Sequence, residues 1–419
     1  MHFLDELSWR GLIQDISDNE GIKKIGAGST FYVGFDPTAP SLQVGNLVPL
    51  IVAMHLGRAG LNPLILFGGA TGHIGDPSGK NAERLLLPRE TIEKNVERQV
   101  RQVETIFARA GVNPGFVNNY EWTKEVTLLD FLRDIGKHFT VNYMLAKDVV
   151  KNRLEGDGIS YAEFSYMLLQ SFDFLHLYST RNCSMQIGGS DQWGNITAGL
   201  ELIRRKIQGD AYAFSFPLLL NAQGKKFGKS ESGTLWLDPL ATSPYRFHQF
   251  WLNVEDADAI RYLKIFTFLD RSAIEQTAEA QKQAPEKRAA QHLLADSVCT
   301  LVHGEEAMAD AKKSAAVLFG GSLKGLSAAQ LQDIFSDVPS STISREQLLR
   351  GTVIDLLANS GLAKSKGEAR RLITSGGAYL NNERISDEAL GFDGTELGSA
   401  ELLVLRSGKK NYHLVRISG

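Results

Sequence analysis

The sequence has few cysteines, no strong excess of either charge and no long apolar run. Its two cysteines, Cys183 and Cys299, lie far apart and have no Cys or His partners at metal-binding spacing. This excludes a disulfide framework and a zinc finger, and it predicts a reducing compartment such as the cytoplasm. No apolar run approaches the roughly 18 residues that span a bilayer, and the N-terminus lacks a basic leader. We therefore expect an unexported protein with no membrane partner.

The charge balance is nearly even, with 45 Lys and Arg against 48 Asp and Glu and a formal net charge of −3. This balance does not indicate a protein that binds nucleic acid over its whole surface, so any RNA contact is expected to be local. A length of 419 residues predicts two or three domains, at about 150 residues per domain.

Short apolar runs alternate with segments of helical period in the first half of the chain. FYVGF (31–35) and PLILFGG (63–69) are bounded by Gly, Pro and Asp, as buried strands are. Between them, residues 46–60 repeat apolar side chains every three or four positions and end on glycine, which predicts a helix. Strand, helix and strand in succession predict a parallel sheet. A second round follows, with SMQIGGSDQ (184–192) as strand and turn and residues 193–208 as helix.

The pattern predicts an α/β chain with several parts. We expect a Rossmann-like parallel-sheet domain at 1–240 that contains a helical insertion at about 127–178. A helical domain is expected at 241–335. SDVPSSTIS is rich in Ser, Thr and Pro, which predicts a linker at 336–349. The remaining residues, 350–419, form a small module with ten Lys and Arg against eight Asp and Glu. It is the only mildly basic part of the chain.

One stretch, YVGFDPTAPSLQVGNL (32–47), joins a strand to a helix whose first turn carries Gly45 and Asn46. A glycine there lets a ligand approach the backbone, and a helix N-terminus offers unpaired N–H groups to phosphate. An ordinary strand-to-helix connection explains the same letters equally well.

A second stretch, GGATGHIGDPSGK (68–80), is rich in glycine and looks like a phosphate loop. It is not a P-loop, because Ile74 and Asn81 stand where that pattern requires Gly and Ser or Thr. It also does not match the dinucleotide fingerprint G-x-G-x-x-G. Its glycines indicate either a ligand close to the backbone or simply a tight loop.

Two further stretches have equally open interpretations. GGSDQWGN (188–195) offers Asp191 and Gln192 to a ribose or an ammonium group, or it is a capped helix start; Gln192 stands where a nucleophile elbow needs Gly. GKKFGKSESG (224–233) contains two lysines three residues apart, Lys226 and Lys229. Such a basic loop can close over a polyphosphate and neutralise the charge of departing pyrophosphate, or it is a surface hairpin.

Together and in this order, the stretches resemble the class I aminoacyl-tRNA synthetases. SLQVGNL resembles their first signature, His-x-Gly-His or His-x-Gly-Asn, and KFGKS resembles the second, Lys-Met-Ser-Lys-Ser. YVGFDPT, GGATGHIGDPSG, EFSYMLLQSFDF and GGSDQWGN resemble the bacterial-type tyrosyl-tRNA synthetases, and the tryptophan enzymes match less well. LLANSGLAKSKGEARRLITSGGAYLNNERI is similar to a small RNA-binding fold first named in a ribosomal protein. The resemblance runs from Leu4 to Arg416. It implies a catalytic nucleotide-binding domain that activates L-tyrosine with ATP and transfers it to the 3′-terminal adenosine of tRNA.

The resemblance assigns six residues to tyrosine: Tyr32 and Asp173 to the phenol, Tyr166, Gln170 and Asp76 to the ammonium group, and Gln192 to a further contact. Tyr166, Gln170 and Asp173 are four and three residues apart, so they share one face of a helix. A site that hydrogen-bonds a hydroxyl group rejects the analogue without it, because its own polar groups are then left unpaired.

For ATP, the resemblance places Asp36, Thr38, Gly45, Asn46, Gly189 and Asp191 around the adenosine and the reacting phosphate, and Lys226, Lys229 and Ser230 at the β- and γ-phosphates. Mg²⁺ would accompany ATP, bound mainly through phosphates and water. The tyrosine carboxylate attacks the α-phosphorus without a side-chain nucleophile, so positioning and charge stabilisation do most of the work. Gln43 replaces the first signature histidine; an amide donates a hydrogen bond but cannot become cationic.

In the basic module the candidates for tRNA phosphate contacts are Lys364, Lys366, Arg370, Arg371, Lys409 and Lys410, although a solvated face explains any one of them equally well. The resemblance also implies a homodimer that forms through the helical insertion. A protein of another class, one that keeps the fold and binds RNA without activating an amino acid, is the main alternative. The retained Lys226 and Lys229 argue against it, since such a protein would be free to lose them.

Overall fold

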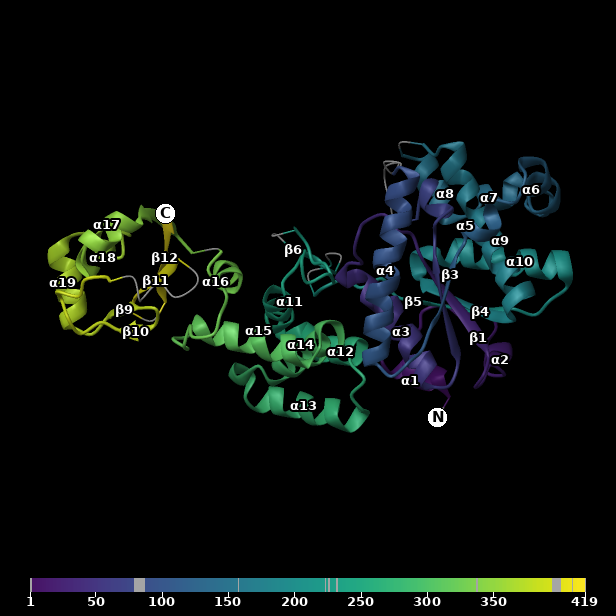
Figure 1. Ribbon diagram of the computed structural model, residues 1–419. Helices are drawn as coiled ribbons and strands as arrows, with labels where there is room; N and C mark the ends of the chain where they lie inside the picture. Colours follow the sequence, from purple (N-terminus) through teal and green to yellow (C-terminus); the bar gives the residue numbers. More distant parts are fainter. Residues whose placement is uncertain are drawn as a thin grey trace. The chain divides into compact units, whose positions relative to one another are not determined.

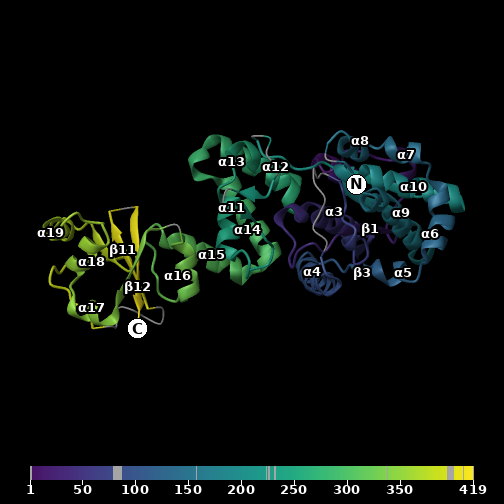
Figure 2. The ribbon, with the colours of Figure 1, turned by 90° about the horizontal axis from the view of Figure 1, so that it is seen from above.

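The computed structural model describes residues 2–78, 87–156, 158–222, 224, 227–230, 233–336, 338–393, 401–408 and 410–418. The chain forms two compact units. The first comprises Met1–Thr242 and Leu252–Val302, and the second comprises Ser243–Trp251 and His303–Gly419 (Figures 1 and 2). Within the described residues, no helix is long and apolar enough to cross a membrane.

The first unit is built on a five-stranded parallel sheet with the order β3-β2-β1-β4-β5. Its strands are β1 (Thr30–Phe35), β2 (Asn62–Phe67), β3 (Gly115–Asn118), β4 (Cys183–Gly189) and β5 (Tyr212–Phe216). The chain moves one way across the sheet from β1 to β3 and the other way from β4 to β5. The carboxyl ends of β1 and β4 therefore flank the switch point, where open α/β sheets bind their ligands.

Helices cover both faces of this sheet. α3 (Leu47–Arg58) and α4 (Arg89–Arg109) lie on one side of the strands, and α9 (Tyr161–Arg181) and α10 (Trp193–Ile207) lie on the other. Right-handed crossovers require this, because α3 and α10 cross the sheet in opposite directions. The two predicted rounds of strand and helix are confirmed, with ends within two residues of those expected. The short helices α1 (Phe3–Trp9) and α2 (Asn19–Ile22) precede β1, and α5 (Tyr120–Thr123) follows β3.

The described part of the predicted insertion consists of helices and connecting loops and contains no strand. It contains α6 (Leu128–Asp134), α7 (Val141–Leu145), α8 (Asp148–Leu154) and α9. A buried ion pair fixes the start of α9: the Arg153 guanidinium donates to both oxygens of Glu163 at 2.7 and 2.8 Å. Glu163 also closes a capping box with Ser160. The helix that carries Tyr166 and Asp173 therefore begins at a defined point.

The second unit contains a mixed sheet of order β10-β9-β11-β12-β8. Its strands are β8 (Ser340–Ser344), β9 (Ala378–Leu380), β10 (Glu383–Arg384), β11 (Leu402–Ser407) and β12 (Asn411–Ser418). Alternate residues of a strand face opposite sides. Leu403 and Leu405 pack in one cluster with the helices that follow β8, which are α17 (Arg345–Arg350), α18 (Val353–Asn359) and α19 (Lys366–Thr374). Leu402 and Val404 pack in another with Val317 of α15 (Glu305–Val317) and Leu331 of α16 (Ala328–Ile334).

The domain limits differ from the expected ones. The helices expected as one domain at 241–335 are divided: α12 (Asp256–Phe266), α13 (Arg271–Gln283) and α14 (Ala289–His303, up to Val302) belong to the first unit. Most of α11 (Pro244–Leu252), together with α15 and α16, belongs to the second. The linker predicted at 336–349 is wrong, because it holds β8 and most of α17. Within the part of the chain that the structure describes, β8 is an edge strand that pairs with β12, and its side chains are partly exposed, so it carries no apolar pattern.

Candidate functional site

Tyr32 lies within β1 and is almost completely buried, with 1% of its surface exposed. Its ring packs against Phe174 of α9, with 5.4 Å between the ring centroids. The Tyr32 hydroxyl has no hydrogen-bond partner among the described residues. Burial, and then the nearby Asp173, raise the pKa of this phenol well above its usual value, so it stays protonated. A buried hydroxyl without a partner costs about 1–3 kcal/mol, which indicates that a ligand completes the bond.

Asp173 lies on α9 and both of its carboxylate oxygens are held by donors. Asn119 Nδ2 donates to Oδ2 and Trp122 Nε1 donates to Oδ1, each at 2.9 Å. Burial raises the pKa of Asp173 to about 7, while the bonds from Asn119 and Trp122 oppose this shift. The carboxyl group is thus fixed in orientation and titrates near neutral pH.

A chain of hydrogen bonds connects Asp173 to Asp36, which follows β1. Asn119 Nδ2 also donates to Thr71 Oγ1 at 3.1 Å, and Thr71 donates to Asp36 Oδ1 at 2.8 Å. The Tyr166 hydroxyl donates to the other Asp36 oxygen at 2.9 Å. Residues predicted from two separate stretches of sequence, Asp36 from one and Tyr166 and Asp173 from the other, therefore meet in one network at the carboxyl end of β1.

The glycines of the 68–80 stretch make room for this network. A Cβ atom on Gly68 would lie 2.2 Å from Asp36 Oδ1 and 2.3 Å from Thr71 Oγ1, and one on Gly69 would lie 2.1 Å from Asn118 Oδ1. Gly45 differs, since a Cβ there would meet nothing within 4 Å. Packing therefore explains Gly68 and Gly69 but not Gly45, which lies exposed in the first signature.

Asp76 and Gln192 form a second bonded group. Gln192 Nε2 donates to Asp76 Oδ2 at 2.6 Å, and the Ser78 N–H donates to Oδ1 at 3.0 Å. Gln192 ends the 3₁₀ turn Ser190–Gln192, which follows β4 directly. Asp76 is buried, with 7% of its surface exposed. Its bond with Gln192 joins the glycine-rich loop to the carboxyl end of β4.

The two expected signatures lie against each other. In the first, the Gln43 N–H donates to Asn46 Oδ1 at 2.9 Å and the Gln43 side chain is exposed. In the second, a Cβ atom on Gly228 would lie 2.5 Å from Val44 Cγ1 and 3.5 Å from the Gly45 nitrogen. Gly228 has a φ of 83°, which favours glycine.

The lysine-bearing loop is only partly described. The backbones of Lys229 and Ser230 form β6 (Lys229–Ser230), which pairs with β7 (Gly233–Thr234). Lys226 lies outside the described residues, as does Lys409 in the second unit.

The other predicted residues have fewer contacts. Gln170 is half-buried on α9 and its side chain makes no hydrogen bond within the described part of the chain, and Thr38 is exposed. Gly189 ends β4, where a Cβ atom would lie 2.5 Å from Asp191 Oδ1. These residues lie at the same carboxyl edge of the sheet as the network from Asp173 to Asp36 and the bonded pair Asp76 and Gln192.

The described basic candidates, Lys364, Lys366, Arg370, Arg371 and Lys410, occupy exposed positions of the second unit. Arg370 and Arg371 project from α19, whereas Lys364 precedes that helix and Lys410 lies between β11 and β12. Lys366 is already paired, because its ammonium group lies 2.7 Å from Asp355. That bond is the main reason why the pKa of Asp355 falls to about 2.

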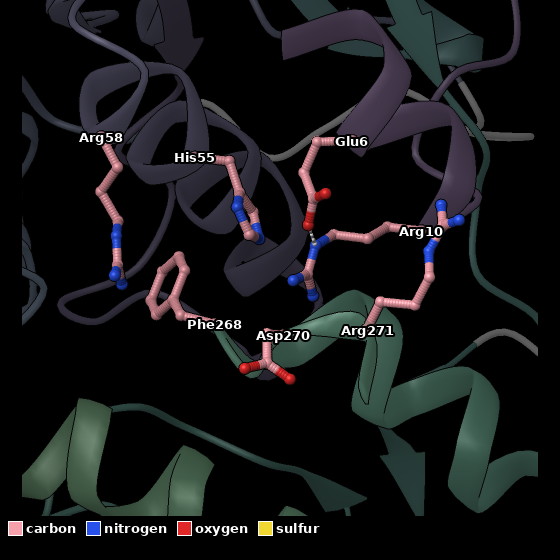
Figure 3. A pocket seen from close by; sticks show the side chains of 7 residues that line it. All are labelled: Glu6, Arg10, His55, Arg58, Phe268, Asp270 and Arg271. Atoms are coloured by element: carbon pink, nitrogen blue, oxygen red, sulfur yellow. Dashed lines mark hydrogen bonds and ion pairs between the residues drawn. The ribbon is translucent and has the colours of Figure 1, made fainter. Parts of the chain in front are cut away.

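A pocket of about 440 Å³ in the first unit holds none of the predicted residues (Figure 3). Arg10 reaches into it and donates to Glu6 and to the carbonyls of Lys264, Thr267 and Leu269 at the end of α12. These bonds satisfy carbonyls that a helix end leaves free. Burial lowers the pKa of His55 to about 3, so this imidazole is neutral. The pocket therefore lies where α1, α3 and the start of α13 meet.

Sequence reasoning missed Asn119 and Trp122, the two donors to Asp173. They follow β3, a short strand that was not expected, and they lie 54 and 51 residues from their partner. The polar pair Asn118 and Asn119 directly after an apolar strand was the available signal. Thr71 was in a quoted motif but had no assigned role.

Comparisons with known proteins agree over nearly the whole chain. Residues 24–320 match the family described as tRNA synthetases class I (W and Y), and residues 330–415 match the tyrosine–tRNA ligase SYY-like C-terminal domain. The tyrosine–tRNA ligase of Roseiflexus castenholzii is 48% identical and covers 99% of both chains. That of Geobacillus stearothermophilus is 48% identical over 99% of this chain and 100% of its own.

A solved structure is also similar. The C-terminally truncated mitochondrial tyrosyl-tRNA synthetase of Aspergillus nidulans has a TM-score of 0.68 and 32% identity over 76% of this chain and 94% of its own. The family of tryptophan and tyrosine enzymes leaves two amino acids open, and the full-length relatives decide between them. The chain belongs to the tyrosine–tRNA ligases, class I aminoacyl-tRNA synthetases that activate tyrosine with ATP and transfer it to tRNA.

Proposed function

We propose that the phenol of tyrosine binds between Tyr32 and Asp173. The observation that carries this proposal is the pairing of an unsatisfied, buried Tyr32 hydroxyl with a carboxylate that two donors hold in place. Tyr32 is then the donor to the phenol oxygen, and Asp173 accepts the phenol proton in a charge-assisted bond. A phenylalanine ring would leave both groups without partners, which costs binding energy.

The ammonium group of tyrosine is assigned to Tyr166, Gln170 and Asp76, with Gln192 as a further contact. The Tyr166 hydroxyl donates to Asp36, so its oxygen lone pairs remain available to accept an N–H. Asp76 accepts from Gln192 and from the Ser78 N–H and still has free lone pairs. The Gln170 amide has no other hydrogen-bond partner within the described residues.

ATP is assigned to the adjoining part of the edge. Exposed Gly45 lets phosphate approach the backbone at the start of α3. The adenosine and α-phosphate contacts are Asp36, Thr38, Asn46, Gly189 and Asp191, and Lys226, Lys229 and Ser230 hold the β- and γ-phosphates. The described residues contain no group of three or more His, Cys, Asp or Glu that could hold a metal. Mg²⁺ is assigned to accompany ATP, bound mainly through phosphate and water oxygens, because this ion gives up its water reluctantly.

Replacement of Tyr32 by Phe tests the phenol site. We expect the preference for tyrosine over phenylalanine to narrow by about 1–2 kcal/mol, the scale of one buried hydrogen bond. Tyrosine-dependent exchange of pyrophosphate into ATP measures it, with tryptophan as a second competitor. Tyr178→Phe is the control, because Tyr178 packs against the same core from the end of α9. An unchanged preference for tyrosine over phenylalanine in Tyr32→Phe would overturn the assignment. Exchange with tryptophan that equals the exchange with tyrosine in the unaltered protein would also overturn it.

Gln43 tests the first signature separately. We expect Gln43→Ala to slow adenylate formation by about 1–2 kcal/mol and to leave tyrosine affinity nearly unchanged, because the residue donates to a phosphate. The turn itself survives, since its bonds come from the Gln43 backbone. Stopped-flow adenylate formation and tyrosine binding separate the two effects. Gln43→His is the comparison, and it should gain only at low pH if charge matters. A full rate in Gln43→Ala refutes the phosphate contact.

We also propose that two copies of the chain associate through the helical insertion. Five apolar side chains on α6 and α7 are exposed, namely Leu128, Leu129, Leu132, Val141 and Leu145. Large apolar side chains exposed in this number on two short helices are typical of an association surface. Sedimentation equilibrium decides between a mass of 46.1 kDa and its double. Neither Cys183 nor Cys299 is in a disulfide bond, which fits a reducing cytoplasm.

A further inference from the structure

Trp122 holds the Asp173 carboxylate from a short element. α5 (Tyr120–Thr123) is a single turn, too short to be rigid by itself. The Trp122 indole must nevertheless stay in one orientation to keep its 2.9 Å bond to Asp173 Oδ1. Its position is therefore set by what packs against the ring.

Trp122 packs against the buried core cluster of the first unit and also against His176. The imidazole stacks on the Trp122 indole with 4.4 Å between the ring centroids and 13° between the planes. His176 lies three residues after Asp173 on α9, so both side chains lie on one face of the helix. The helix that carries the carboxylate thus also carries the ring that orients its donor.

Further aromatic rings support the imidazole. Phe172 meets His176 edge-on, with 6.3 Å between centroids and 66° between planes. Phe131 of α6 meets Phe172 in the same way, at 6.3 Å and 84°. The column of Phe131, Phe172, His176 and Trp122 ends on the carboxylate that we assign to the tyrosine phenol.

We propose that His176 is a positioning residue for amino-acid recognition, which keeps the Trp122 indole N–H on Asp173 and so preserves discrimination between tyrosine and phenylalanine. The inference rests on the proposed role of Asp173. His176 itself does not touch the substrate; it acts through Trp122. Loss of its ring lets the indole turn, and Asp173 then loses one of the two donors that favour its ionised, phenol-accepting form.

The experiment compares His176→Ala, His176→Leu and His176→Phe in the full chain. We expect the ratio of kcat/KM for tyrosine to that for phenylalanine to fall about 2- to 10-fold in the Ala and Leu variants, mostly through KM for tyrosine. The Phe variant keeps a stacking ring and retains the ratio. His292→Ala, which removes an exposed imidazole from α14, is the matched control.

A pH profile separates positioning from a general loss of stability. The titratable groups that act on Asp173 are Tyr32 on β1 and Asp36 beyond it. His176 is itself titratable, with a pKa that burial lowers, so the comparison is made between variants that all lack its imidazole. The inflection of kcat/KM for tyrosine should move to higher pH in His176→Ala and stay in place in His176→Phe, because only the first loses the Trp122 donor. Global destabilisation would change the melting temperature without moving this inflection.

The outcomes distinguish the inference from its foundation. If Asp173→Asn loses the tyrosine preference while His176→Leu keeps both the ratio and the inflection, the role of His176 is refuted and the phenol site stands. If Asp173→Asn also keeps the preference, both fail. If His176→Phe is as impaired as His176→Leu, ring stacking is not the cause and the inference is overturned.

Discussion

Asp173→Asn is expected to lower kcat/KM for tyrosine activation by about 10- to 100-fold. The substitution removes a hydrogen bond to a charged group, which contributes about 1.5–3 kcal/mol in proteins. It also turns an amide N–H₂ toward one of the two donors, Asn119 or Trp122, so that donor loses its acceptor. Pyrophosphate exchange at varied tyrosine concentration measures the loss.

The same residue predicts a pH dependence. Burial raises the pKa of Asp173 from 3.8 to about 7, so the carboxyl group takes up a proton as pH falls through 7. We expect kcat/KM for tyrosine to fall below about pH 7 and to level off above it, with no such step in Asp173→Asn. Tyrosine binding at pH 6.5 should release part of a proton, which calorimetry in two buffers of different ionisation enthalpy detects.

The stability effect has the opposite direction. A carboxyl group whose pKa is higher in the folded state stabilises the fold fully below its unfolded pKa, and this contribution is lost as pH rises through the folded value. The ligand-free protein should therefore lose stability between about pH 4 and pH 7 through Asp173.

For the kinetic prediction, a kcat/KM for tyrosine that does not change from pH 6 to 8 would contradict the assignment of Asp173 to the phenol.

A chain that stops near Leu323 is expected to form tyrosyl-adenylate and to charge tRNA on the order of 10²-fold less well. It keeps all residues of the candidate site but loses the basic candidates on α19 and beyond, and phosphate contacts supply much of the affinity for nucleic acid. The solved Aspergillus nidulans enzyme is itself C-terminally truncated and resembles 76% of this chain. If the short chain charges tRNA as well as the full chain does, the assignment of tRNA binding to the residues after Leu323 is refuted.

The cut has a structural cost that needs a separate control. Val317 and Leu318 pack in one cluster with Leu402 and Val404 of β11, so truncation exposes an apolar surface on α15. The double substitution Arg370→Glu and Arg371→Glu avoids this, because both side chains are exposed on α19. It should lower the rate of tRNA charging and leave the fold intact. The rate of adenylate formation and the salt dependence of that rate should stay unchanged. Lys366 is unsuitable because it is paired with Asp355.

The sequence predicted those elements whose signal is local. β1, α3 and β2 have apolar patterns of the right period, and glycine or proline marks their ends. The polar face of α9 was equally visible, because Tyr166 and Asp173 interrupt an apolar helix at helical spacing. Family motifs then located most of the residues that gather at the carboxyl ends of β1 and β4.

The parts that escaped prediction depend on distant partners. β8 is a Ser- and Thr-rich edge strand. It forms because β12, about seventy residues later, provides the backbone hydrogen-bond partners for it. Asn119 and Trp122 acquire their roles only when β3 brings them beside α9. The division of the helices after residue 241 between two units likewise depends on distant partners: α12 packs against α3, whereas α15 and α16 pack against β11. No local pattern contains such information.

The bonded series from Asp173 through Asn119 and Thr71 to Asp36 has a thermodynamic consequence. Asp173 is assigned to the amino acid and Asp36 to the nucleotide, so the two substrates act on opposite ends of one set of hydrogen bonds. Linkage makes any resulting cooperativity reciprocal: the factor by which tyrosine changes the affinity for ATP equals the factor by which ATP changes the affinity for tyrosine. Order of addition then affects the path to the ternary complex but not its free energy.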